Sequence, residues 1–264
     1  MRAAFSGRTM PPNVTELGYL ATMNDAYVRS FEARVTALPP GAVVLDRTYF
    51  YPAGGGQLAD RGTLTLPGGG TTQVSDVTKS GPSVIHRIAR GGRSNPLVVG
   101  AVVEGTIDWE RRHRHMRLHT AQHLLSARIF SLTGVRTRKA AMAGESGTID
   151  LERPLPPDQS ADMLEQDLND FLVRGLEVRV LQVPRAEWEK APSARSGLVP
   201  LAPQVDPVRV IAIDGADECP CGGTHVRSTA EVGRVAVTTA VPISDGGVRI
   251  PFTLSGDAPS TPPA

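Results

Sequence analysis

Two short segments combine side chains that bind transition metals. His119 and His123 are four residues apart. In a helix this spacing turns the chain by about 400°, so both imidazoles would project from one face, one turn apart. Cys221 and His225 show the same spacing in the segment Cys-Gly-Gly-Thr-His, where glycine lets the backbone fold back towards one centre. We therefore predict one metal site formed by these four residues.

The donor atoms of this group indicate which metal it binds. Three imidazoles and one thiolate form a borderline-soft set that suits Zn²⁺ better than Mg²⁺ or Ca²⁺, so we expect one zinc ion per chain. Cys219 competes with Cys221 for the sulfur position, since only a proline separates the two cysteines. We favour Cys221, because its spacing to His225 repeats that of the histidine pair.

The role of the zinc is open at this point. The residue after His119 is Thr120 and not the glutamate of a His-Glu-x-x-His metalloprotease, which argues against peptide hydrolysis. Four protein ligands are the usual pattern of a structural zinc. A catalytic zinc would have to add a fifth ligand or release one.

A basic run precedes the first half of this site. Arg111, Arg112 and Arg114 lie just before His119, and arginine suits bidentate contacts with phosphate. Such a run is also typical of a solvated helix face. The net charge of +1 gives no sign of nucleic-acid binding by the chain as a whole. We predict that these three arginines contact phosphates and keep the solvated face as the alternative.

Residues 50–62 read FYPAGGGQLADRG. The glycines do not match a phosphate-binding P-loop, which ends in Gly-Lys-Ser/Thr, and could be a flexible turn. Aromatic residues beside glycines could instead offer a tight surface for an RNA backbone or a stacked base. The residues predicted to contact RNA here are Gly54, Gly55, Gly56, Gln57 and Asp60.

The elements around these motifs follow from the hydrophobic pattern. Apolar residues near helical spacing predict a helix over residues 16–37, which Pro39-Pro40-Gly41 would end. From residue 42 to 108, short β-type runs separated by glycine-rich turns predict a small barrel. The helix and the barrel form the first predicted domain, residues 1–108.

A second domain is predicted over residues 109–254. It would contain a helix over 117–130 that carries the histidine pair, and another between Pro156-Pro157-Asp158 and Gly175. Strands are predicted over 177–183 and 208–214, and a hairpin around residues 244–247. Strands mixed with separate helices indicate an α+β domain. The last residues, 255–264, have the composition of a disordered tail.

The bulk composition is that of a globular protein, with 40% hydrophobic and 21% charged residues. No apolar run approaches the ~20 residues needed to cross a bilayer, and the first residues lack the apolar stretch of a secretory signal. We therefore expect a cytoplasmic protein without a membrane partner. The sequence indicates no obligate protein partner.

Taken together, the motifs resemble those of the AlaX-type alanyl-tRNA editing proteins, freestanding relatives of the editing domain of alanyl-tRNA synthetase. The resemblance extends over about residues 15–240 and keeps the motif order. The glycine-rich N-terminal part is similar to the medium-length class, since the shortest members lack it. The matching pieces are Thr15-Glu16-Leu17 with Tyr27 and Phe31-Glu32-Ala33, FYPAGGGQLADRG, residues 116–125 (MRLHTAQHLL) and residues 221–226 (CGGTHV).

The resemblance implies a small glycine-rich barrel followed by a zinc-containing α+β editing domain. It implies zinc at the four residues named above, and a substrate of serine, or glycine, wrongly esterified to alanine tRNA. Relatives usually offer a polar side chain to the amino-acid pocket from the strand after the histidine helix. Thr137 is the only hydroxyl residue in the corresponding stretch, residues 135–142, so the preference between serine and glycine stays open.

Two other functions share these motifs. One is a non-catalytic tRNA-binding module in which zinc only stabilises the fold. The other is a zinc hydrolase of a small ester or amide, which the missing glutamate after His119 disfavours. The sequence points to no protein general base.

Overall fold

The computed structural model describes residues 2–3, 14–88, 97–191 and 204–256. The chain divides into two compact units. Unit 1 contains residues 1–54 and 58–113, and unit 2 contains residues 55–57 and 114–263. The three residues 55–57 therefore belong to unit 2, although the chain on both sides of them belongs to unit 1.

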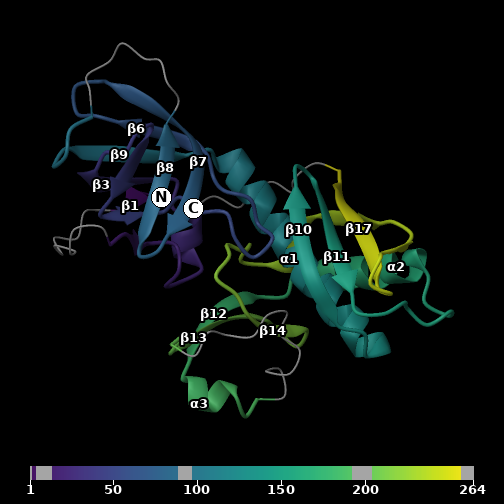
Figure 1. Cartoon of the computed structure of the whole chain (residues 1–264). Coiled ribbons are helices and arrows are strands. Elements are labelled where there is room, and N and C mark those ends of the chain that lie inside the picture. Colours follow the sequence, from purple (N-terminus) through teal and green to yellow (C-terminus); the bar gives the residue numbers. More distant parts are fainter. Residues whose placement is uncertain (1, 4–13, 89–96, 192–203, 257–264) are drawn as a thin grey trace. The chain divides into compact units, whose positions relative to one another are not determined.

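Unit 1 is built on a closed six-stranded barrel (Figure 1), which confirms the predicted small barrel. Its sheet has the order β1-β3-β4-β8-β7-β6-β9, and an additional pairing of β3 with β9 closes it. The strands are β1 (Arg2–Ala3), β3 (Ser30–Ala37), β4 (Ala42–Leu45), β6 (Gly62–Thr65), β7 (Thr71–Ser80), β8 (Ser83–Ile88) and β9 (Val102–Ile107). A separate parallel pair joins β2 (Glu16–Leu17) to β5 (Arg47–Thr48).

The helix predicted over residues 16–37 is wrong. This segment contains β2, a short 3-10 helix η1 (Asn24–Tyr27) and the barrel strand β3. Phe31, Ala33 and Val35 alternate inwards with a period of two, and all three are buried. Because β3 pairs with both β4 and β9, its backbone hydrogen bonds are satisfied across the barrel. A helical reading of a few apolar residues could not detect this long-range pairing.

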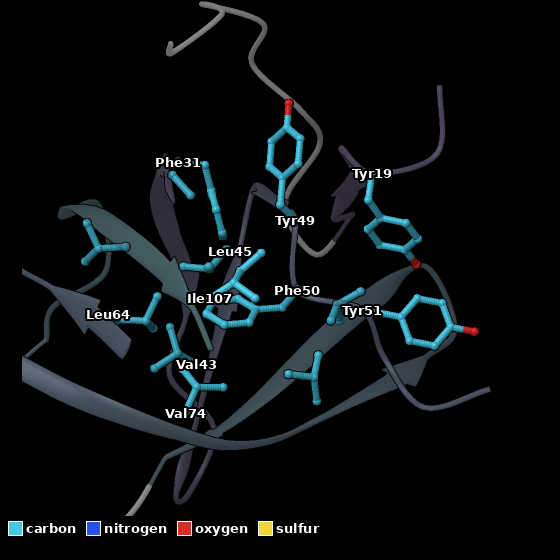
Figure 2. Close-up of a cluster of buried hydrophobic side chains, with 14 of the residues drawn as sticks. Tyr19, Phe31, Val43, Leu45, Tyr49, Phe50, Tyr51, Leu64, Val74 and Ile107 are labelled. Atoms are coloured by element: carbon cyan, nitrogen blue, oxygen red, sulfur yellow. The ribbon is translucent and has the colours of Figure 1, made fainter. Parts of the chain in front are cut away.

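The barrel interior is filled by aromatic and branched aliphatic side chains, among them Phe31, Val43, Phe50 and Leu64 (Figure 2). Phe31 meets Phe50 edge to face, with ring centroids 5.6 Å apart. A Cβ atom on Gly105 would lie only 2.6 Å from the Phe31 ring, so this strand position must be glycine. Burial of these side chains supplies the main stabilisation of unit 1.

Unit 2 combines two sheets with a few helices, consistent with the predicted α+β class (Figure 1). One sheet has the order β10-β11-β17-β15, with β16 also paired to β17, and the other has the order β12-β13-β14. The strands are β10 (Thr137–Ala143), β11 (Ser146–Leu151), β12 (Val178–Val183), β13 (Val208–Ile213), β14 (Asp217–Pro220), β15 (Arg234–Val237), β16 (Val241–Pro242) and β17 (Val248–Ser255). The helices are α2 (Ala161–Leu172), α3 (Arg185–Trp188) and the 3-10 helix η3 (Thr229–Val232).

The histidine pair lies on α1 (Trp109–Thr133), which is longer than the predicted helix at both ends. It begins earlier because the Asp108 carboxylate accepts a hydrogen bond from the Arg111 amide at 3.1 Å and caps the first turn. It ends at Gly134, whose φ of +67° is readily adopted only by glycine. Within the described part of the chain, none of the helices combines the length and the apolarity of a membrane span.

The predicted hairpin near the end of the chain is confirmed, since β16 and β17 pair around a turn in which Ile243 N donates to Gly247 O at 3.0 Å. The predicted tail begins at Ser255, which is still the last residue of β17. Residues 257–264 of that tail lie outside the described residues.

Candidate metal centre

His119, His123, Cys221 and His225 converge in unit 2. One ligand atom from each residue lies within 4.8 Å of the others. The Sγ atom of Cys221 is 3.5 Å from Nε2 of His119 and 3.4 Å from Nε2 of His225. The three imidazole centroids lie 4.3–5.1 Å apart. This is the spacing of donors that surround a single ion.

The sulfur ligand comes from the loop after β14, and β13 holds this loop in place. The amide of Cys221 donates to the carbonyl of Arg209 at 3.1 Å, and the Arg209 guanidinium donates to the carbonyl of Cys221. Both backbone groups of Cys221 are thus fixed by one residue of the neighbouring strand. The amide of Gly223 also donates to Cys221 Sγ at 3.2 Å, and a hydrogen bond of this kind is stronger when the sulfur is ionised.

The two glycines of this loop have different roles. A Cβ atom on Gly223 would lie 2.1 Å from Cε1 of His119, so a side chain there would displace the imidazole. A Cβ atom on Gly222 would meet no heavy atom within 4 Å. Gly223 therefore lets the loop approach the helix closely, whereas Gly222 does not contribute to this approach.

Each histidine has a partner on the ring nitrogen that faces away from the centre. Nδ1 of His119 lies 2.8 Å from Gln57 Oε1, and Nδ1 of His123 lies 3.0 Å from Asp217 Oδ2. Because both partners are acceptors, Nδ1 carries the proton in each ring, and the Nε2 lone pair is directed inwards. Nδ1 of His225 lies 3.2 Å from Thr120 Oγ1. Such outer partners are typical of metal-binding histidines, so the residues present fit a metal ion.

The glycine-rich segment carries Gln57 to this centre. Gly56 has a φ of +84°, its carbonyl accepts a hydrogen bond from Met142 of β10 at 2.9 Å, and a Cβ atom there would lie 2.5 Å from the Ala140 carbonyl oxygen. Gln57 is buried, and its Nε2 donates to Thr224 Oγ1 at 2.8 Å. The structure therefore places Gln57 against His119 and Thr224, while Gly54 and Gly55 are exposed.

The electrostatics of the cluster favour the ligand forms of Cys221 and His225 but the protonated form of His123. Burial raises the pKa of the Cys221 thiol, but the charges of the three histidines outweigh burial and hold this pKa well below its usual value. Burial, together with the charge of His119, holds the pKa of His225 well below its usual value. Burial lowers the pKa of His123, yet Cys221 and Asp217 outweigh it and raise the pKa to about 10. Metal binding here therefore requires His123 to lose a proton.

Burial of Arg112 and Asp60 rules out the RNA contacts expected for these two residues. The side chains of Arg112 and Asp60 are both 0% exposed and form an ion pair inside unit 1. Arg112 Nε donates to Asp60 Oδ2 at 2.9 Å, and a second nitrogen donates to the Ala26 carbonyl at 2.9 Å. Neither side chain can reach a phosphate, so the expectation of an RNA contact is corrected to a structural role. The sequence pattern could not separate an inward from an outward arginine on this helix.

Among the remaining residues of that group, Gln57 and Thr137 are also buried, whereas Arg111 and Arg114 are partly exposed. Arg111 is half-buried and its Nε donates to the Ala59 carbonyl at 2.9 Å. Arg114 is 38% exposed and lies 3.7 Å from Glu145. The Thr137 hydroxyl donates to Ser126 Oγ at 2.9 Å, one turn of α1 beyond His123.

Sequence reasoning missed Asp217 and the part that Thr120 plays. Thr120 adjoins a ligand in sequence, but only the fold brings its hydroxyl to His225. Asp217 also belongs to a second group of potential ligands with His123 and Cys219, whose ligand atoms lie within 4.8 Å of one another. Cys221, and not Cys219, is the cysteine grouped with all three histidines, in keeping with the spacing argument.

Family models match two parts of the chain. A model of the class II (A) tRNA synthetases matches residues 14–111. A model of the threonyl and alanyl tRNA synthetase second additional domain matches residues 208–251, which include the Cys-Gly-Gly-Thr-His loop. Both matched ranges thus resemble parts of tRNA-charging enzymes, and His119 and His123 lie between them.

Curated relatives fall into two groups. An alanine–tRNA ligase from Pyrobaculum neutrophilum is 38% identical over 92% of this chain, but the chain spans only 27% of the length of that ligase. An alanyl-tRNA editing protein AlaX-M from Saccharolobus solfataricus is 31% identical over 88% of this chain and 97% of its own length. A second AlaX-M protein, from Methanosarcina barkeri, is 33% identical over 87% of this chain and 96% of its own length.

Proposed function

Because this chain belongs to the AlaX-type family of alanyl-tRNA editing proteins, we propose that it hydrolyses mischarged alanine tRNA in trans. The bond cut is the ester between the amino acid and the terminal ribose, and the amino acid removed is serine or glycine. The partner is alanine tRNA that carries one of these two amino acids. The cofactor is one zinc ion per chain.

The observation that carries this proposal is the convergence of three imidazoles and one thiolate in unit 2, each imidazole with an outer partner. His119, His123, Cys221 and His225 would hold the ion. An N₃S donor group suits zinc. When bound, zinc can polarise an ester carbonyl or lower the pKa of a water molecule to about 7.

The protein itself contributes orientation. Gln57 and Asp217 keep Nδ1 of two histidines protonated, so that the inward nitrogens stay available as ligands. Thr224 N donates to Gln57 Oε1 at 3.1 Å, which fixes the amide that orients His119. An aminoacyl ester is already activated, so positioning and modest polarisation are sufficient, and we assign no protein general base.

Amino-acid selectivity would come from the polar side chains beside His123. Gln122 Nε2 donates to Ser126 Oγ at 3.0 Å, and Ser126 also accepts the hydroxyl of Thr137. A serine hydroxyl can join such a chain of hydrogen bonds, whereas the methyl group of alanine cannot. A site that hydrogen-bonds a substrate hydroxyl discriminates strongly against an analogue that lacks it. We propose Thr137 as the residue that meets the amino acid.

The test is release of amino acid from alanine tRNA charged with serine, glycine or alanine, measured with zinc-loaded and with zinc-stripped protein. We expect release of serine or glycine, sparing of alanine, and loss of activity without zinc. Full activity of zinc-free protein would remove the metal from the mechanism.

A second candidate is a non-catalytic tRNA-binding module with a structural zinc. The presence of four protein donors favours it, because these would complete a tetrahedron without room for a substrate. It predicts tight binding of alanine tRNA with no release of any of the three amino acids. The same charged tRNAs therefore separate the two candidates.

A further inference from the structure

We propose that the exposed cations around β10 form a binding surface for RNA phosphates. This basic strip consists of Arg136, Arg138 and Lys139 with Arg249 of β17, and all four side chains are exposed. The proposal rests on the function proposed above, since its partner is the RNA strand whose end carries the ester. It adds residues other than Arg111 and Arg114 of α1.

The strip lies on the strand that also borders the metal centre. β10 is the edge strand of its sheet. The amide of its Met142 donates to the carbonyl of Gly56, and the next residue, Gln57, contacts His119. Thr137, inside the strip, turns towards Ser126 on α1. An RNA end that reaches the centre along this edge therefore brings its last phosphates over the strip.

A bulge exposes the central cation. Thr137 pairs with Leu151 and Lys139 pairs with Asp150, so Arg138 is the extra residue between two successive pairs. Its guanidinium reaches Asp245 in the turn before β17, at 2.8 Å. Bulges next to functional sites commonly redirect a side chain in this way.

The strip carries a surplus of positive charge. Asp150 accepts two hydrogen bonds from Arg249, at 2.7 and 2.8 Å, and these bonds with the charges of Arg249, Lys139 and Arg138 lower its pKa. Three cations thus act on Asp150, and Asp245 offsets one of them. Lys139 has no ion pair among the residues that the structure describes. A polyanion would find this cation available and could compete for the arginines.

Charged residues on edge strands also have a purely protective role, because they prevent pairing between the sheets of two molecules. Under that alternative, neutral replacements would promote self-association and leave RNA binding unchanged. The two readings therefore predict different results for one variant.

The experiment measures binding of uncharged alanine tRNA over a range of salt concentrations. The variant is Arg138→Gln with Lys139→Gln in the full chain. The matched control removes two other exposed cations of unit 2, Arg179→Gln with Arg234→Gln. We expect affinity about tenfold lower at low salt, and a salt slope flatter by about 1.5 because two phosphate contacts are lost. The control should stay within about twofold of wild type.

An unchanged affinity and salt slope would overturn the proposal, above all if the variant self-associates. Hydrolysis of seryl-adenosine, which has the ester but no phosphates, should be equal in the variant and in wild type. If wild type cleaves neither seryl-adenosine nor charged tRNA, the proposed hydrolysis is wrong. The salt dependence of tRNA binding still tests whether the basic strip binds RNA.

Discussion

The imidazole of His119 lies between two residues that carry no strong metal ligand. Gln57 fixes its Nδ1 on one side, and Gly223 leaves space for the ring on the other. Neither residue would be found by a search for metal-binding side chains. Both act by position, one through an acceptor oxygen and the other through a missing Cβ atom.

Gly223→Ala should lower zinc affinity by about 10- to 100-fold, the usual effect of misplacing a ligand or its outer partner. The added methyl group would overlap His119 and move its ring. Gly222→Ala is the matched control, since nothing lies near its Cβ position. Competition with a chromophoric chelator measures both affinities, and equal values for the two variants would contradict this account.

Helix α1 carries both a buried ion pair and two of the proposed metal ligands. Its first turn is anchored in unit 1 by the buried ion pair of Arg112 and Asp60, and its later turns carry His119 and His123. A buried pair that loses one partner leaves an uncompensated charge in the protein interior. Replacement of Arg112 or Asp60 should therefore lower stability rather than act directly on the metal centre.

Arg112→Met should lower the free energy of unfolding of unit 1 by about 3–5 kcal/mol, because the Asp60 carboxylate stays buried without its partner. Arg111→Met, one residue earlier and half-buried, should cost less than about 1 kcal/mol. Urea unfolding in a Trp188→Phe background, followed by Trp109 fluorescence, compares the two variants. A loss of tRNA affinity in Arg112→Met without destabilisation would restore the phosphate-contact hypothesis for this residue.

The barrel contains one fully buried histidine. Nδ1 of His86 lies 3.1 Å from the Val43 carbonyl, and its Nε2 lies 2.8 Å from Thr48 Oγ1. Burial lowers its pKa from 6.5 to about 4, and the hydrogen bond to Val43 offsets only part of this effect. The folded barrel therefore binds fewer protons than the unfolded chain between these two pH values.

Stability of unit 1 should be highest above pH 6.5 and should fall as the pH drops towards 4, by about 3 kcal/mol at most from this residue. In His86→Gln the amide can still pair with Val43 and Thr48 but does not titrate. The loss over this pH range should therefore be smaller in the variant. Urea unfolding of a Trp188→Phe background isolates the Trp109 signal of unit 1, and equal pH profiles would refute the assignment.

In the chain as a whole, the metal centre is formed by segments that are far apart in the sequence. Its members come from the glycine-rich segment, from α1 and from the loop after β14, all within unit 2. An ion bound only by the folded state stabilises that state by mass action. Removal of the metal should therefore lower the stability of the folded state as well as the activity.

Chelation should lower the melting temperature of wild type by several degrees, on the order of the shift for a few kcal/mol of binding energy. Cys221→Ser should melt near the chelated value and respond little to the chelator. Cys219→Ser is the matched control, because Cys219 is not grouped with His119 and His225, and it should respond like wild type. Scanning calorimetry with and without chelator measures the shift. Loss of the response in Cys219→Ser alone would assign the sulfur ligand to Cys219.

Local patterns were sufficient to predict much of this protein. The spacing of His119 and His123 and that of Cys221 and His225 identified the four residues that converge, because i, i+4 positions on a helix and a glycine-containing turn have limited geometries. The β-type runs between glycine-rich turns predicted the barrel, because several short strands with frequent turns are typical of that fold. Motif order indicated the family.

Only tertiary structure decided which partners these groups have. β3 was misread as part of a helix, since strand pairing with β4 and β9 is a long-range property. Arg112 turned inwards to Asp60, and Gln57 turned to His119, although both lay in segments read as RNA-binding. The physical reason is that burial and hydrogen-bond satisfaction depend on groups far apart in the chain, which side-chain type and spacing do not specify.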